Sequence, residues 1–179
     1  LWMLARTSQD MMYECYSNDA GASWSSWTPS SFYGTLTMPT LHRLSDCRIL
    51  CIWCNTTPLV EADRSDSSLS QYAQDGTWED VFTNRDAVHA AISEDDGATW
   101  LGFRELRLNP LRNDSDYAER AERDLSVHQS QVLELTEEGK ILISHGQDEE
   151  VRALLIFDVD WLYESSRSCR FENGLDDWS

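Results

Sequence analysis

The chain has 179 residues, of which 32 are acidic and 14 are basic, so its formal net charge is −18. So acidic a chain repels phosphate groups, which argues against nucleic acid and anionic membranes as partners. No stretch approaches the roughly 18 consecutive apolar residues of a membrane-spanning helix, and we therefore expect no membrane insertion.

The first part of the chain predicts short strands joined by turns. Apolar runs over 1–7 and 11–17 are typical of strands, and a turn-forming segment over 17–24 follows the second run. We expect a third strand over 23–28. Residues 29–37 contain turn-forming and aromatic residues and predict a loop.

Four strands are predicted in the middle of the chain, over 38–44, 48–54, 85–93 and 99–106. A short turn at Ser45-Asp46 joins the first two of them, whereas a polar stretch over 55–84 joins the second and third. Connections as long as 55–84 are uncommon in compact domains and are usually functional or disordered.

The last predicted strands lie over 126–135, 140–145 and 151–159. A second long connection, over 107–124, precedes them, and within it residues 117–123 predict a short helix. We expect residues 161–164 to leave the sheets. The tail, 165–179, is expected to be a linker or the start of a further β-sandwich domain.

One phrase occurs twice, as Ser17-Asn18-Asp19-Ala20-Gly21-Ala22-Ser23-Trp24 and as Ser93-Glu94-Asp95-Asp96-Gly97-Ala98-Thr99-Trp100. Both copies read Ser-x-Asp-x-Gly-x-[Ser/Thr]-Trp, and each follows an apolar strand. We interpret the phrase as a hairpin turn in which Asp and the hydroxyl residues bond backbone amides and Gly adopts a positive φ. The Trp is expected to bury its ring beneath the hairpin.

This pattern resembles the Asp box, or BNR repeat, of the sialidase (neuraminidase) superfamily. The resemblance implies an all-β fold, a β-propeller of four-stranded antiparallel blades, six-bladed in the sialidases. At about 40–50 residues per blade, residues 1–164 would hold about three blades. We expect them to be the C-terminal part of a larger propeller whose remainder is a partner of this chain, and a compact three-bladed unit is the alternative.

In such a blade, alternate connections lie on opposite faces. The two repeats and the short turns share one face, so the long connections share the other, where sites usually lie. This placement selects candidate catalytic residues, which are His128, His145 and Asp86. It also selects candidate substrate-binding residues, which are Asn84, Arg85, His89, Arg112, Asn55, Gln129, Gln131 and Gln147. Four aromatic residues, Trp53, Trp78, Phe82 and Tyr33, are candidates for stacking on sugar rings.

Sialidases use a tyrosine paired with a glutamate, an aspartate acid/base and three arginines that hold the substrate carboxylate. The resemblance implies such a binding role for Arg85, which precedes the second repeat. No tyrosine lies between Tyr117 and Tyr163, and His128 and His145 stand in the matching segment. Histidine titrates near neutrality, which suits proton transfer.

Three functions therefore remain open. The first is a secreted or periplasmic sialidase-like glycoside hydrolase that acts on a glycan, at a terminal sugar. The second is a His-dependent polysaccharide lyase on the same fold, and the third is a carbohydrate-binding propeller without turnover. We expect no cofactor and no metal, because Cys51-x-x-Cys54 lies within an apolar strand and is interpreted as a pair of buried small residues.

Overall fold

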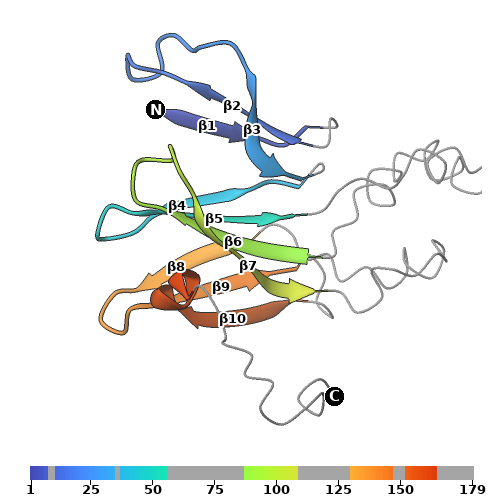
Figure 1. The fold of residues 1–179 in the computed structure, drawn as a ribbon, viewed down its shortest axis with the longest axis vertical. Helices are drawn as coiled ribbons and strands as arrows, with labels where there is room; N and C mark the ends of the chain where they lie inside the picture. Colours follow the sequence, from blue (N-terminus) through green and yellow to red (C-terminus); the bar gives the residue numbers. More distant parts are fainter. Residues whose placement is uncertain (8–10, 35–36, 56–86, 109–129, 147–151, 165–179) are drawn as a thin grey trace, which may run out of the picture.

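The computed structural model describes residues 1–7, 11–34, 37–55, 87–108, 130–146 and 152–164. In these residues the chain is all-β apart from one short 3-10 helix, as the sequence predicts (Figure 1). The elements are β1 Trp2–Ala5, β2 Met11–Tyr16, β3 Thr28–Tyr33, β4 Thr40–Arg43, β5 Ile49–Cys54, β6 Ala87–Ser93, β7 Leu101–Leu108, β8 Gln131–Leu135, β9 Lys140–His145, β10 Ala153–Asp158 and η1 Val159–Tyr163.

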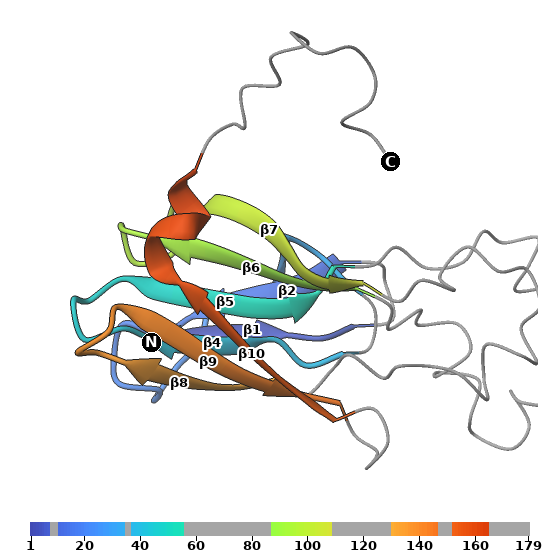
Figure 2. The same ribbon diagram turned by 90° about the horizontal axis from the view of Figure 1, so that it is seen from below.

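The strands form three antiparallel sheets in chain order. The first sheet is β1-β2-β3, the middle sheet is β4-β5-β6-β7, and the third sheet is β8-β9-β10. Each strand pairs with the next one in the chain, so every sheet is a meander, and within the described residues no sheet closes on itself. The middle sheet lies between the other two (Figures 1 and 2).

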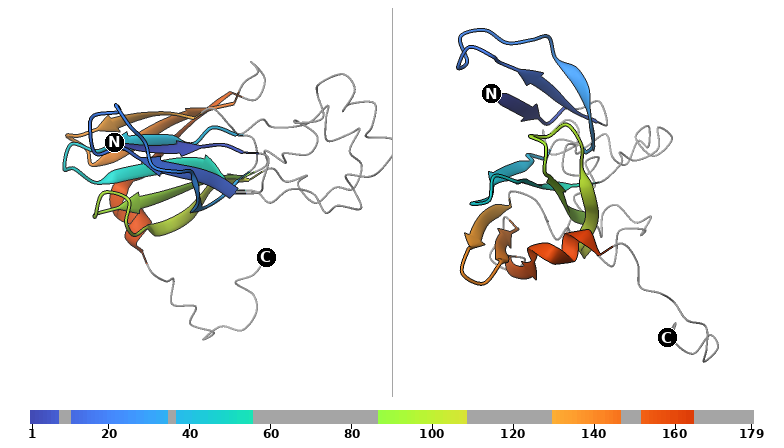
Figure 3. Two further views of the ribbon diagram at one scale, coloured as in Figure 1. Left: turned by 90° about the horizontal axis from the view of Figure 1, so that it is seen from above. Right: turned by 60° about the vertical axis from the view of Figure 1, so that its left-hand side comes forward.

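The middle sheet is covered on both faces, which explains its continuous apolar strands. Every residue of β5 is buried. Successive side chains point to opposite faces of a strand, and accordingly Leu50 and Ile52 pack against the third sheet, whereas Cys51 and Trp53 pack against the first. The 3-10 helix η1 packs beside β7, with Leu162 buried in the core between the middle and third sheets (Figure 3).

The third sheet is covered on one face only. Ile141 and Ile143 face the middle sheet and are fully buried. On the opposite face Leu133, Leu154 and Ile156 are exposed, and Leu154 retains 68% of its accessible surface. An apolar outer face of this kind is typical of a surface that packs against another element.

The strand ends gather at two edges of the molecule. The ends of β5, β7 and β9 and the starts of β6, β8 and β10 share one edge, which we call the far edge. The end of β3 reaches the far edge as well. Its last residue, Tyr33, accepts a hydrogen bond through its carbonyl from Nε1 of Trp53, which lies near the end of β5 (3.0 Å). Both repeats and the short β4–β5 and β8–β9 turns lie at the opposite edge, the repeat edge, where Ser45 donates twice to Glu134 (2.7 and 2.8 Å).

Both copies of the repeat form the same hydrogen-bonded turn. Ser93 Oγ donates to Asp95 Oδ1 (2.9 Å) and accepts from the Gly97 amide (2.8 Å). The Asp95 carboxylate accepts from the Thr99 amide (2.7 Å) and hydroxyl (2.6 Å). The first copy repeats each of these bonds within 0.1 Å. Gly97 has a φ of +93° and Gly21 one of +92°, so the predicted turn is confirmed.

Neither closing tryptophan is fully buried, which corrects the expectation that both rings are buried, and the two differ in how far they are covered. Trp100 packs between Trp2 and Phe32 of the first sheet, at ring distances of 5.9 and 4.9 Å. Trp24 remains 39% exposed. The reason is position, because the first sheet covers Trp100, whereas no described sheet lies beyond the first to cover Trp24 in the same way.

Two predicted boundaries are wrong. The strand expected over 23–28 is β3, Thr28–Tyr33, so part of the expected loop over 29–37 is strand. Asp19 holds Ser23 inside the turn through its carboxylate, and the chain pairs with β2 only afterwards. Residues 161–164 belong to no sheet, as expected, but η1 still packs against the sheets and buries Leu162 in the core. The predicted helix over 117–123 and the tail over 165–179 lie outside the described residues.

Candidate functional site

Four of the predicted site residues are described, and they lie at or near the far edge. They are Asn55, His89, Gln131 and His145. The other predicted site residues, which are Asn84, Arg85, Asp86, Arg112, His128, Gln129 and Gln147, lie outside the described residues, and their roles stay predictions.

His145 lies between the middle and third sheets, directly beside Arg107. It is the last residue of β9 and follows Ile141 and Ile143 on the inner face of the third sheet. Arg107 lies near the end of β7, opposite Val88, whose side chain faces the same interface. The two side chains meet with Arg107 Nη1 3.2 Å from His145 Nε2. His145 is only 1% exposed.

Burial and the contact with Arg107 together determine the protonation of His145. An arginine guanidinium can only donate, so His145 Nε2 accepts and the neutral ring carries its proton on Nδ1. Burial, followed by the positive charge of Arg107, lowers the pKa of His145 to about 4. Nδ1 is buried and has no hydrogen-bond partner among the described residues. At neutral pH this histidine is therefore uncharged and holds an arginine in place.

His89 does not join His145, because it lies on the opposite face of the middle sheet. It packs against Trp53, with ring centroids 5.8 Å apart, on the side of the first sheet. Burial lowers its pKa, and Glu105 opposes that shift. Its Nδ1 is also buried without a partner among the described residues. The two histidines thus occupy two separate interfaces.

Asn55 and Gln131 lie at the far edge, after the end of β5 and at the start of β8. The backbone amide of Asn55 donates to the Ala87 carbonyl (3.1 Å) and closes the end of the β5–β6 ladder. Gln131 is exposed, and its neighbour Val132 is the residue that packs into the inner core. By strand alternation Gln131 points to the outer face of the third sheet. The structure therefore brings His145 and Arg107 together and leaves Gln131 on another surface.

Because β5 is buried on both faces, the structure decides how Trp53 and the Cys51-x-x-Cys54 pair are to be interpreted. Trp53 is 2% exposed and donates to the Tyr33 carbonyl, so it packs in the core and does not offer a face to a sugar. Cys51 and Cys54 are buried on opposite faces of the strand, as the interpretation of small core residues predicts. Burial raises the pKa of the Cys51 thiol. Two cysteines that face apart cannot share one metal ion.

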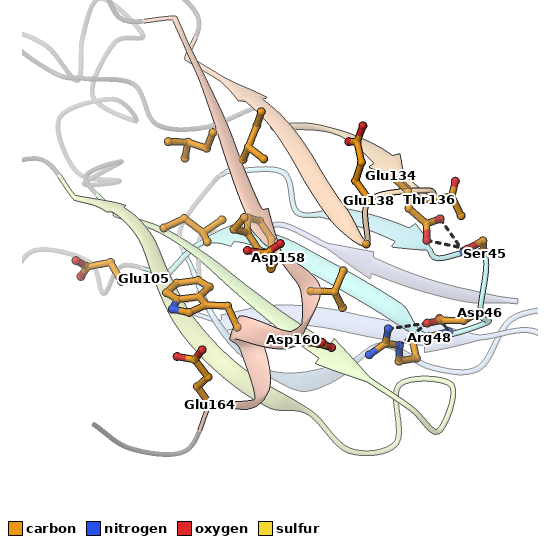
Figure 4. A pocket seen from close by; sticks show the side chains of 17 residues that line it. Ser45, Asp46, Arg48, Glu105, Glu134, Thr136, Glu138, Asp158, Asp160 and Glu164 are labelled. Carbon is orange, nitrogen blue, oxygen red and sulfur yellow. Dashed lines mark hydrogen bonds and ion pairs between the residues drawn. The ribbon is translucent and has the colours of Figure 1, made fainter. Parts of the chain in front are cut away.

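A groove of about 870 Å³ lies at the rim between β7 and β10 and extends to the repeat edge (Figure 4). Seven carboxylate side chains line it, at Asp46, Glu105, Glu134, Glu138, Asp158, Asp160 and Glu164. The one basic residue in its lining, Arg48, forms an ion pair with Asp46, in which Nη2 lies 2.6 Å from Oδ2. Such a groove repels an anionic ligand, and no group of metal-ligating residues is found among the described side chains.

Arg107 is the residue that the sequence did not reveal. The predicted strand ended at Leu106, so Arg107 was expected in the following connection. The observed β7 continues to Leu108. The alternation of Leu106, Arg107 and Leu108 is the signal that would have extended the strand, although it does not show that Arg107 faces a histidine.

Comparison with known proteins leaves the family open: no family model and no curated protein matches the chain. In the part of the chain that the structure describes, no helix has the length and apolar character needed to cross a bilayer. The far edge and its side chains therefore carry the functional inference.

Proposed function

We propose that this chain belongs to a sialidase-like β-propeller whose far edge binds a glycan and hydrolyses a glycosidic bond. The observation that carries the proposal is the contact between Arg107 and the buried, neutral His145 at the edge away from both repeats. A positioned guanidinium and a histidine at strand ends, on a rigid β scaffold, are suited to holding a polar substrate.

The propeller part of the proposal is supported by how successive sheets cover one another. The first sheet covers Trp100 of the middle sheet, and a further sheet would cover Trp24 of the first sheet in the same way. The exposed Leu133, Leu154 and Ile156 offer an apolar face for a further sheet beyond the third. On this proposal the remainder of the propeller packs on both outer faces, and the function is extracytoplasmic.

The catalytic step is proposed to use the acid and base residues predicted at the far edge. Glycoside hydrolysis needs one group that protonates the leaving oxygen and a second that activates water or attacks the sugar. Asp86 and His128 are the proposed pair. His145, with its lowered pKa and its Nε2 occupied by Arg107, is better suited to positioning than to proton transfer at neutral pH.

A polysaccharide lyase is the second candidate, and one observation favours it. A lyase that removes the C5 proton of a uronate needs a cation beside the carboxylate and a neutral base nearby. Arg107 is such a cation, and His128 is the proposed base, because the Nε2 of His145 is already occupied by Arg107. The third candidate is a propeller that binds glycans without turnover. It would bind the glycan at the same edge but would lack a working acid and base.

The test is an activity screen of the protein on sialosides, neutral exo-glycosidase substrates and uronate glycans. Release of a free sugar supports the hydrolase, and an unsaturated product absorbing in the near ultraviolet supports the lyase instead. Asp86→Asn and His128→Ala should each abolish hydrolysis while leaving the melting temperature unchanged. Binding without any product would contradict the hydrolase proposal, and full activity in both variants would contradict the assigned catalytic pair.

A further inference from the structure

The 3-10 helix η1 follows the third sheet in the chain but packs on the middle sheet. It begins directly after β10, and the amide of Val159 donates to the carbonyl of Gly139 in the β8–β9 turn (3.1 Å). It contacts both β7 and β10, and its Leu162 is buried in the core that the middle and third sheets share (Figure 4). η1 therefore joins the two sheets at their rim.

Trp161 contacts both sides of this rim. Its ring packs against Phe157 of β10, with centroids 5.9 Å apart, and the guanidinium of Arg104 on β7 lies over it at 5.0 Å. A guanidinium over an indole ring is a favourable contact in its own right. Arg104 also donates to the carbonyl of Glu164, the residue that follows η1. These contacts link β10 to β7.

Tyr163 links η1 to the repeat edge. Its hydroxyl accepts from Arg48 Nη1 (2.9 Å) and donates to Glu94 Oε1 of the second repeat (2.8 Å). The guanidinium of Arg48 also lies over the Tyr163 ring, 5.5 Å from its centroid, and Asp46 holds that guanidinium by an ion pair. Hydrogen bonds to charged groups are stronger than those between neutral groups, so this phenol is a firm connection.

The middle sheet accommodates η1 at a glycine. Gly102 of β7 has a φ of +93°, and a Cβ built there would lie 3.3 Å from the Leu162 carbonyl oxygen and 3.5 Å from the Leu162 Cβ. A side chain at this position would push η1 away from β7 and would also be strained at this φ. A glycine within a strand often marks such a close approach of another backbone.

We propose that η1 together with Glu164 is a clasp that fastens the third sheet to the middle sheet, and that the clasp and the third sheet open as one unit below the free energy of global unfolding. A three-stranded sheet depends on packing for its stability, and the outer face of this one is exposed. Arg107 and His145 meet across the same interface, so each opening separates them. The inference concerns how two sheets are joined and does not depend on the proposed function.

Native-state hydrogen exchange of the intact protein, followed by NMR, tests the separate opening. β9 is the central strand of the third sheet and β5 is a central strand of the middle sheet, so the amides of both are paired within their sheets. Exchange reports the free energy of the opening that exposes each amide. We expect protection factors at least tenfold lower in β9 than in β5. Equal protection of the two strands would overturn the proposal.

Tyr163→Phe tests the clasp, because it removes the hydroxyl and keeps the ring. We expect the protection of β9 to fall about tenfold, as for the loss of hydrogen bonds to charged groups, while β5 stays as in the parent. The matched control is Tyr16→Phe in the first sheet, where the hydroxyl donates to Glu14 (3.1 Å), and it should leave β9 unchanged. Unchanged protection of β9 in Tyr163→Phe, or an equal fall in β5 and β9, would refute the clasp.

Gly102→Ala perturbs the clasp from the other side of the contact. It should lower the protection of β9 at least as much as Tyr163→Phe does, because it displaces Leu162. Strain confined to β7 would instead appear in β6, with which β7 pairs. A fall in β6 without one in β9 would therefore contradict the proposal. If Gly102→Ala does not fold, Tyr163→Phe decides alone.

Discussion

The burial of His145 beside Arg107 predicts a specific loss of stability in mild acid. The folded protein lowers the pKa of His145 from 6.5 to about 4. Above pH 6.5 the ring is neutral in both states and contributes nothing. Between pH 6.5 and 4 the unfolded chain takes up a proton that the folded protein excludes, so the free energy of unfolding falls. At about 1.4 kcal/mol per pKa unit, the full loss approaches about 3 kcal/mol.

The assay compares the protein with His145→Gln, which keeps an acceptor for Arg107 but does not titrate. Urea unfolding followed by tryptophan fluorescence, at constant ionic strength and at pH 7.5, 6.5, 5.5 and 4.5, gives the free energy of unfolding of each. Carboxylates titrate equally in both proteins and cancel in the difference. The stability of the parent relative to the variant should fall by about 2.5 kcal/mol from pH 7.5 to 4.5.

Two outcomes would refute this reasoning. A difference that stays constant with pH would show that His145 titrates alike in the folded and unfolded states. An NMR titration that gave His145 an ordinary pKa would do the same without reference to unfolding. Arg107→Gln is the matched perturbation: removing the positive charge should raise the pKa of His145 part of the way, because burial, the larger cause, remains.

Two further predictions concern the repeats. Ser93→Ala removes the acceptor of the Gly97 amide at a buried position and should lower the free energy of unfolding, measured in urea, by about 1–3 kcal/mol. Ser17→Ala, the same change in the first copy, should lower it by a similar amount. No loss in either variant would show that the serine does not hold the turn. Trp100→Ala should cost about 2–4 kcal/mol because its ring packs on Trp2 and Phe32, whereas Trp24→Ala should cost at most about 1 kcal/mol in this chain. Equal losses for the two tryptophans would contradict the difference in coverage seen between the sheets.

Much of the fold could be predicted from the sequence because its signals are local. The continuous apolar run from Ile49 to Cys54 needs cover on both sides, and β5 is buried on both sides. The repeats predicted their own turn, since Ser93, Asp95 and Gly97 form the bonds within a few residues of one another. Strand ends were less well predicted where a turn extends into the expected strand, as at Ser23.

The candidate site was predicted in outline only. Alternation of short and long connections correctly placed His145 at the edge away from the repeats. Arg107 was not predicted, and His89 was grouped with His145 although the two histidines face different sheets. A register shift between Val88 and His89 changes which residues of β7 lie opposite β6, and no pattern in the sequence predicts such a shift.

The sequence by itself determined the antiparallel strands, the geometry of the two repeats and the edge to which His145 belongs. These features depend on hydrogen bonds between near neighbours and on the alternation of apolar residues. Only the tertiary structure decided that Arg107 meets His145, that Trp53 is a core residue, and that Trp24 and Trp100 differ. Each of these depends on how one sheet lies on the next, and contacts between sheets join residues that are far apart in the chain.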